Sequence, residues 1–370
     1  MSALAVATNS VNLGQGFPDA GGPEEVTEAA VAAIRAGHNQ YPPGKGIPEL
    51  RAAVAQHQAR CYGLSFDFED EVLITAGATE ALVAALLALL EVGDEVVMFE
   101  PFYDAYAAGV AMAGATRRVV TLRPGIGVDG GYGFDPAELA AAITPRTRLV
   151  LVNTPHNPTG KVFSRAELEV IAACCIEHDL LALTDEVYEH LVYEGAHVPL
   201  ASLPGMAERT VTVSSAGKTF AVTGWKVGWA CAPAPLLAAV RAAKQFLTYV
   251  NGAPFQHAVA FALQAGSRIT DPLVRELSAN RDLLCGGLET LGLSVLRPQA
   301  TYFVTTDIRT IGEDDGVEFC RRLPERCGVV AVPSVVFYDH QDAGRHLVRW
   351  TFCKRRETLE EALMRLKALR

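Results

Sequence analysis

Two lysines stand in a segment whose composition is otherwise typical of a protein interior. Residues 211–231, VTVSSAGKTFAVTGWKVGWAC, are mostly small and apolar, yet they include Lys218 and Lys226. Lysine is strongly hydrated and is seldom buried without a partner. In a partly desolvated cleft its pKa falls, and the amine becomes a nucleophile suited to Schiff-base formation. The segment therefore predicts lysine chemistry, with the second lysine available to neutralise an anion.

Other polar or small residues follow strand-like runs elsewhere in the chain. In open α/β sheets, ligands bind beyond the carboxyl ends of the strands. Groups that follow different strands are therefore expected to meet at one edge of the sheet. Besides the lysines, these residues are Gly77, Ala78, Tyr103, Asn157, Asp185, Val187, Tyr188 and Ser215.

This set suits a pocket for pyridoxal phosphate, in which the protonated ring acts as an electron sink. The small-residue turn before the apolar helix offers backbone N–H groups to a phosphate, and Ser215 and Lys226 could add to that cup. Asp185 could keep a pyridine nitrogen protonated. Tyr188 could bond a phenolic oxygen, and Tyr103 could stack on the ring.

The elements that must position these groups alternate along the chain. Helix-like segments separate most of the strand-like runs; one of them, residues 164–179, opens with a serine and an acidic first turn. This rhythm predicts a doubly wound, mostly parallel sheet between helices. Beyond residue 266 the pattern changes to longer helices and few strands, which predicts a smaller second domain. The strand-like runs are residues 71–75, 94–99, 117–122, 147–153, 180–185, 210–215 and 226–231.

Composition narrows the class of protein. Half of the 370 residues are hydrophobic, enough for a large core and two domains. The net charge of −10 argues against nucleic acid or an anionic membrane as partner. The longest apolar run, residues 81–90, is too short to span a bilayer. Eight cysteines without CxxC spacing indicate neither a metal site nor disulfides, and no secretory signal opens the chain. We therefore expect a cytoplasmic protein.

Several blocks, in this order, resemble the signatures of class I/II aminotransferases of fold type I. The likeness is to the branch that holds kynurenine, glutamine and methionine aminotransferases and actinobacterial N-succinyldiaminopimelate aminotransferases. It implies an α/β fold with a seven-stranded, mostly parallel sheet in a large domain (34–262) and a smaller α+β domain (1–33 and 263–370). It also implies a homodimer with shared active sites, which moves an amino group from an L-amino acid to a 2-oxo acid by a ping-pong mechanism. The blocks are LGQGFPD (13–19), EPFYDAY (100–106), NTPHNPTG (153–160), DEVYEHL (185–191), SSAGKTF (214–220), TGWKVGW (223–229) and LVRWTFCK (347–354).

The resemblance assigns roles around the cofactor ring. It implies that Lys218 forms the Schiff base and then serves as the base for the proton shift. Asp185 would pair with the pyridinium nitrogen. The phenolate oxygen would be bonded by Asn157 and Tyr188, and the two ring faces would be covered by Tyr103 and Val187.

The resemblance also implies which residues bind the cofactor phosphate and the substrate α-carboxylate. The phosphate would be held by Gly77, Ala78, Ser215, Lys226 and, from the neighbouring subunit, Tyr41. The substrate α-carboxylate would be gripped by Arg349 through a bidentate fork, with help from Asn157 and the backbone at Gly16. His190 is expected to cap a loop near the pocket without a chemical role.

The donor and two alternative functions stay open. Aromatic and small residues around the site favour a neutral or aromatic donor of the methionine, glutamine or kynurenine type. YPPG (41–44) and VRAAKQFLTYVNGAPFQ (240–256) are similar to the N-succinyldiaminopimelate branch instead. One alternative is a cysteine-conjugate β-lyase on the same scaffold, and another is a non-catalytic binding relative. A P-loop is excluded, because its first glycine would fall on Thr212.

Overall fold

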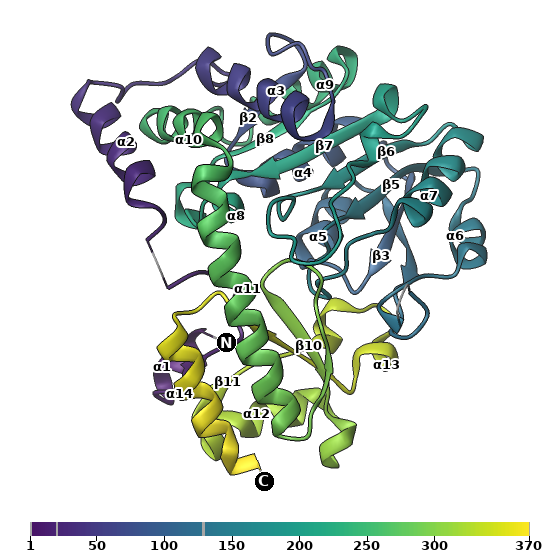
Figure 1. Ribbon diagram of the computed structural model, residues 1–370. Helices are drawn as coiled ribbons and strands as arrows, with labels where there is room; N and C mark the ends of the chain where they lie inside the picture. The colour runs from purple at the N-terminus through teal and green to yellow at the C-terminus, as the bar shows by residue number, and fades with distance from the viewer. Residues whose placement is uncertain (1, 20, 128–129, 370) are drawn as a thin grey trace.

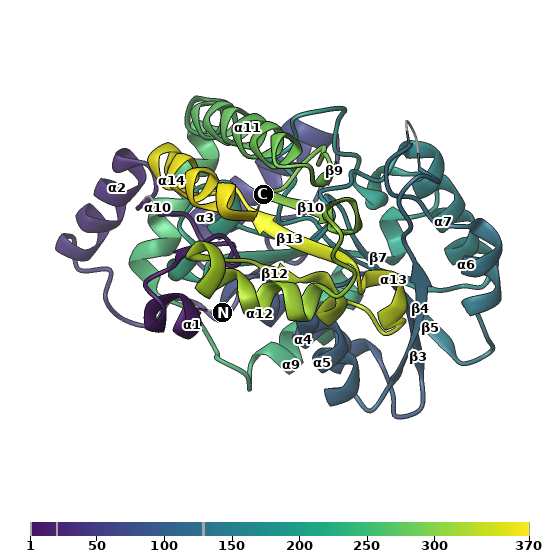
Figure 2. The same cartoon turned by 90° about the horizontal axis from the view of Figure 1, so that it is seen from below.

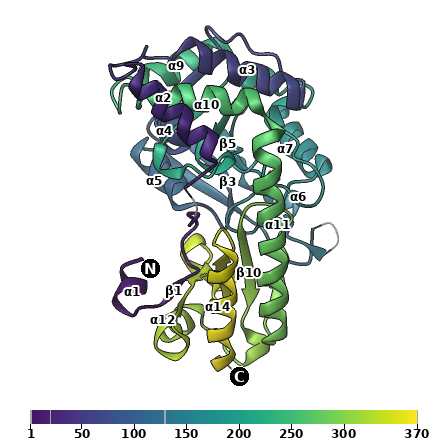
Figure 3. The ribbon, with the colours of Figure 1, turned by 60° about the vertical axis from the view of Figure 1, so that its left-hand side comes forward.

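The computed structural model describes residues 2–19, 21–127 and 130–369, which form two connected parts (Figure 1). In the upper part of the view, a seven-stranded sheet lies between helices. The lower part holds a four-stranded sheet and both ends of the chain. Figure 3 shows the same division from the side, with the long helix α11 (Ser267–Thr290) running from one part into the other.

The large sheet has the strand order β2-β8-β7-β6-β5-β3-β4. β8 runs antiparallel to both of its neighbours, and the other adjacent pairs are parallel. Each strand coincides with a strand-like run of the sequence, so the predicted mostly parallel, seven-stranded sheet is confirmed. The strands are β2 (Val72–Thr75), β3 (Glu95–Glu100), β4 (Thr116–Thr121), β5 (Thr147–Asn153), β6 (Leu181–Asp185), β7 (Thr210–Ser215) and β8 (Gly228–Cys231).

Helices cover both faces of this sheet, which explains the continuous apolar run in the middle of β3. In β3, Val96 and Met98 pack into the core on one face, and Val97 and Phe99 into the core on the other. Alternate side chains of a strand point to opposite faces, so burial of both faces needs a continuous apolar run. The first face carries α4 (Gly77–Leu89), α5 (Asp104–Met112) and α9 (Ala234–Lys244). The second carries α2 (Glu24–Arg35), α3 (Pro48–Tyr62), α6 (Pro136–Ala142), α7 (Arg165–Glu177) and α10 (Ala253–Ala265).

The start predicted for the helix at residue 164 is confirmed in its details. The Ser164 hydroxyl accepts a hydrogen bond from the Glu167 backbone N–H (3.3 Å), and the Glu167 carboxylate accepts one from the Ser164 N–H (2.8 Å). This reciprocal capping box satisfies N–H groups that a helix start otherwise leaves without partners.

The smaller part is built on an antiparallel sheet of order β12-β13-β10-β9, seen from below in Figure 2. Beside it, β1 pairs in parallel with β11 and so ties the N-terminal segment to this part. Its strands are β1 (Val11–Asn12), β9 (Ser294–Leu296), β10 (Phe303–Asp307), β11 (Val329–Val330), β12 (Val332–Pro333) and β13 (Leu347–Thr351). Its helices, besides α11, are α1 (Ser2–Ala7), α12 (Gly316–Cys327), α13 (Gln341–Gly344) and α14 (Arg356–Leu366).

The N-terminal segment contacts both parts in turn. After β1, helix α2 packs Val26 and Ala30 into the same apolar cluster as Val259 of α10. The division of the chain at residues 33/34 and 262/263 stays a prediction. Within the described residues, no helix is both long enough and apolar enough to cross a membrane.

Candidate active site

The carboxyl ends of β2, β5, β6 and β7 open into a cavity of about 430 Å³, closed on its other side by residues of the smaller part. Twelve of the thirteen predicted site residues line it. They are Gly16, Gly77, Ala78, Tyr103, Asn157, Asp185, Val187, Tyr188, Ser215, Lys218, Lys226 and Arg349. The thirteenth, Tyr41, is not brought to this cavity: its side chain is 84% exposed and lies edge-on to Tyr249.

Lys218 is presented by the short helix α8 (Ala216–Thr219), which begins where β7 ends. Its Nζ donates a hydrogen bond to the Tyr302 hydroxyl at 2.8 Å, and that hydroxyl donates to the Gly16 carbonyl at 2.7 Å. The ammonium also faces the rings of Tyr188 and Tyr302, at 5.9 and 5.5 Å from their centroids. Burial lowers the pKa of Lys218, which favours the neutral amine that a nucleophile or base requires.

Asp185 is the last residue of β6 and lies at the floor of the cavity. Its Oδ2 accepts a hydrogen bond from the Tyr106 hydroxyl at 2.6 Å, and its Oδ1 accepts one from the Val187 N–H at 3.3 Å. Burial raises the pKa of Asp185 to about 6 even though both bonds act against the rise. A buried carboxylate with few donors is stabilised by a cationic partner, such as a protonated ring nitrogen.

Arg349 of β13 enters the cavity from the smaller part. Its planar group lies between the rings of Phe303 and Phe337, at 4.1 and 4.6 Å from their centroids. It donates to Asn157 Oδ1 (3.2 Å) and to the Gly14 carbonyl (3.1 Å). Burial lowers the pKa of Arg349 to about 10, so the group is still charged at pH 7. Its Nε has no hydrogen-bond partner among the described residues, and a buried cationic donor in this state fits an anion.

The start of α4 forms the other cationic end of the cavity. Gly77, its first residue, has φ +78°, and a Cβ there would lie 3.3 Å from the Cε and Nζ of Lys226. Gly228 packs against the same turn so closely that a Cβ would lie 2.5 Å from the Gly77 carbonyl carbon. Free N–H groups at a helix start, together with a lysine ammonium, make an anion site.

Sequence reasoning missed several residues that hold this constellation in place. The side chain of Asn153 accepts from the Asn157 N–H at 2.7 Å and donates to the Asp185 carbonyl at 2.9 Å. Tyr106 and Tyr302 supply the hydroxyls that contact Asp185 and Lys218. Tyr106 stands in the block EPFYDAY and Tyr302 in none of the blocks, but in either place an isolated tyrosine gives no signal of a partner far away in the chain.

Comparisons with known proteins agree with this geometry. The family described as aminotransferase class I and II matches residues 8–366. A Mycobacterium tuberculosis protein named as a probable N-succinyldiaminopimelate aminotransferase is 52% identical over 379 residues, covering 100% of this chain and 94% of that protein. The methionine aminotransferase of Escherichia coli is 39% identical over 374 residues, covering 100% and 94%. A solved structure of the M. tuberculosis N-succinyldiaminopimelate aminotransferase superposes with a TM-score of 0.97 at 53% identity, covering 100% of this chain and 96% of that one.

The chain therefore belongs to the class I and II aminotransferases, and the predicted family, fold type and reaction class are confirmed. It is a transferase that uses pyridoxal 5'-phosphate. The β-lyase and the non-catalytic alternatives are not favoured by these relatives.

The residues of the cavity fit that cofactor. The start of α4 and Lys226 together form a positively charged site that can bind a phosphate. A side chain at Gly77 would crowd the lysine. The buried Asp185 matches a protonated ring nitrogen, and Lys218 lies in the same cavity with a lowered pKa. Each of the three chemical features of the cofactor thus meets a complementary group of this chain.

Proposed function

We propose that this cavity transfers the amino group of an L-amino acid with Lys218 as the proton-moving residue and Arg349 as the α-carboxylate site, and that N-succinyldiaminopimelate is the preferred donor. The observation that carries the proposal is the meeting of a lysine amine, a buried carboxylate and a buried guanidinium around one cavity.

The cofactor, when bound, supplies the electron sink that makes the α-proton of the substrate acidic. Asp185 holds the proton on the ring nitrogen, because its buried charge is stabilised by that cation. Asn157 and Tyr188 would bond the phenolic oxygen of the cofactor, and Tyr103 and Val187 would cover its ring. The start of α4, Ser215 and Lys226 bind the phosphate.

The lysine works best as a base when it is neutral and held in place. Burial lowers the pKa of Lys218, and its hydrogen bond to the Tyr302 hydroxyl holds Nζ in place. The Tyr302 hydroxyl is in turn fixed by the Gly16 carbonyl. These contacts let Nζ take a proton from the substrate α-carbon and return it at a neighbouring atom.

The choice of donor rests on the relatives and on the cations of the cavity. The 52% identical relative favours N-succinyldiaminopimelate. In the part of the chain that the structure describes, the lysine and arginine side chains that line the cavity are Lys218, Lys226 and Arg349. Lys45, which would have to reach the cavity from a partner subunit, pairs with Asp70 of its own chain at 2.7 Å. A neutral donor such as methionine is therefore the second candidate. If N-succinyldiaminopimelate is the donor, its distal carboxylate must be bound by groups other than these three cations.

A donor comparison with an arginine variant tests the proposal. N-succinyldiaminopimelate, methionine, glutamine and kynurenine are supplied at equal concentration, and the loss of cofactor absorbance is followed. We expect the first to react fastest. Arg349→Ala should weaken kcat/KM for all four donors, by about 2–5 kcal/mol, since each presents an α-carboxylate. If Arg349→Ala lowered kcat/KM for one donor only, the role of Arg349 would be contradicted. If methionine reacted faster than N-succinyldiaminopimelate, methionine would be the preferred donor and the reaction class would be unchanged.

We further propose a cytoplasmic homodimer in which Tyr41 completes the partner's phosphate site. The exposed aromatic side chains Tyr41 (84%) and Phe246 (89%) support a covered face. The eight cysteines are free, as is usual for proteins of a reducing compartment.

A further inference from the structure

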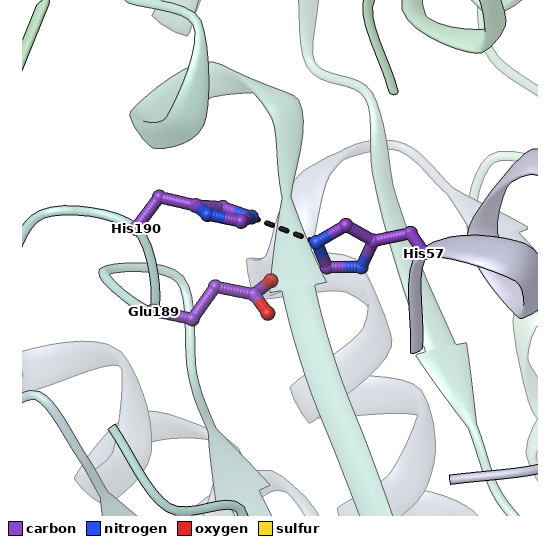
Figure 4. Close-up of side chains that lie close together, drawn as sticks. All are labelled: His57, Glu189 and His190. Atoms are coloured by element: carbon purple, nitrogen blue, oxygen red, sulfur yellow. Dashed lines mark hydrogen bonds between the residues drawn. The ribbon is translucent and has the colours of Figure 1, made fainter. Parts of the chain in front are cut away.

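A second cluster of polar side chains lies near the catalytic strand ends but outside the cavity described above. His57 of α3 meets Glu189 and His190, which belong to the turn after β6 (Figure 4). The Nε2 atoms of the two histidines are 2.8 Å apart, although the residues are 133 positions apart in the sequence. The Glu189 carboxylate points toward the gap between the rings, and one potential ligand atom of each residue lies within 4.8 Å of the others.

Two atoms of this cluster that could bind a metal ion have no regular hydrogen bond within the described part of the protein. Glu189 is 4% exposed, and its Oε1 accepts from the Ser214 hydroxyl at 2.5 Å. Among the residues described, no hydrogen bond of normal geometry reaches Glu189 Oε2 or His57 Nδ1 although both are buried; the Tyr62 hydroxyl interacts with Glu189 and the Cys61 thiol with His57. A buried carboxylate oxygen without a regular hydrogen bond is costly, so its retention beside two imidazoles indicates a ligand.

We infer that His57, Glu189 and His190 bind one divalent transition-metal ion, and that Zn²⁺ matches the site best. Two imidazole nitrogens and one carboxylate oxygen form a ligand set that zinc takes with an open fourth position. Two nitrogens on one tetrahedral zinc lie about 3.3 Å apart at bond lengths of about 2.0–2.1 Å. The rings therefore need to separate by only about 0.5 Å from their present contact to admit the ion.

Two of the three residues of the cluster have charge states that suit a cation. Burial opposes protonation of the third, His57, but the Glu189 charge raises its pKa overall, so a metal ion has to compete with a proton there. Burial lowers the pKa of His190 to about 4, so this ring is neutral at pH 7, the form that binds metals. Burial opposes ionisation of Glu189, but the rings of His57 and His190 hold its pKa below the usual range. The carboxylate is thus ionised, and a metal ion would compensate its charge beside the neutral His190 ring.

Access to the cluster comes from the side away from the cofactor cavity. His57 and His190 line a cavity of about 360 Å³, together with Cys61 and Arg60. This space leaves room for water as the remaining ligand. Cys61 interacts with the His57 ring, which lowers the pKa of the thiol, but Cys61 is not one of the three residues whose ligand atoms converge. Since Glu189 follows Tyr188 directly, a bound ion would tie α3 to the turn that carries residues of the active site.

The test measures zinc on the cofactor-loaded enzyme. After treatment with a chelator and gel filtration, Zn²⁺ is titrated in, and the bound metal per chain and the Tm are recorded. We expect one tightly bound Zn²⁺ per chain and a rise in Tm. His57→Gln and Glu189→Gln should each weaken binding at least about 100-fold, because loss of an outer-shell partner alone costs 10–100-fold, and the Tm rise should vanish. If a variant fails to fold, the amount of zinc bound per chain of the wild-type enzyme still tests the inference.

Two control variants separate this site from adventitious binding. His257→Gln removes a residue of another close histidine pair, with ring centroids 4.0 Å apart, and should leave the tight equivalent intact, as should Cys61→Ser. The inference is overturned if the wild-type enzyme takes up no tight equivalent, or if His57→Gln binds as well as the wild type. Loss of zinc in Cys61→Ser with retention in Glu189→Gln would also overturn the assigned ligands.

Discussion

The charge of Asp185 depends on the groups that surround its carboxylate and on what occupies the cavity. Burial raises the pKa of Asp185 to about 6, whereas the hydrogen bond from Tyr106 lowers it. Asp185→Asn keeps the shape but cannot stabilise a protonated ring nitrogen. We expect the variant to retain the cofactor and to lose on the order of 10²–10³-fold in kcat, with a smaller change in KM. Steady-state kinetics with a saturating acceptor check this, and unchanged turnover would place the ring nitrogen elsewhere.

The variant Tyr106→Phe tests the ionisation of Asp185 through the pH dependence of the reaction. Without the hydroxyl that lowers it, the pKa of Asp185 rises. A reaction that needs the ionised carboxylate then fails at a higher pH than before. The acidic limb of the kcat/KM profile should therefore shift to higher pH, while the rate on the plateau falls less than in Asp185→Asn. An acidic limb that does not move would show that another group controls it.

At the scale of elements, the fit of β8 against the start of α4 shapes the phosphate end of the cavity. A Cβ at Gly228 would lie 2.5 Å from Gly77 C and 2.7 Å from Ala78 N, both backbone atoms that cannot rotate away. Gly228→Ala should therefore cost about 1–3 kcal/mol of stability and speed the loss of the cofactor on dialysis. Gly224→Ala is the matched control, since its added Cβ meets nothing within 4 Å. Equal behaviour of both variants in thermal melts and cofactor absorbance would refute the argument.

The elements that the sequence predicts well are those with a local cause. Strand β3 follows from the apolar run Val96–Phe99, because both faces are covered and every side chain is buried. Helix α7 follows from its capping box. The contact of Tyr302 with Lys218 has no local cause, since it joins residues that are 84 positions apart in the sequence. The meeting of His57 with His190 is hidden in the same way, because α3 is brought to the turn after β6 only by packing on the sheet.

For the whole molecule, we propose that a second subunit completes the site. Tyr41 stands 84% exposed outside the cavity of its own chain. If it reaches the partner's phosphate, Tyr41→Phe should release the cofactor several-fold faster on dilution, although the variant's own cavity is unchanged. Light scattering should report twice the chain mass for both forms. A monomer that retains its cofactor fully would contradict the shared site.

In the proposed function, Lys218 is the residue that carries the chemistry. Reduction of the cofactor-loaded enzyme with borohydride, followed by peptide mapping, tests it directly, because reduction makes the lysine–cofactor link permanent. We expect the reduced cofactor to be attached to Lys218, within the peptide that follows β7, and no attached cofactor in Lys218→Ala. A label on Lys226, which is expected to hold the phosphate, or on Lys244, whose Nζ donates to the Gly44 carbonyl at 3.0 Å, would contradict it.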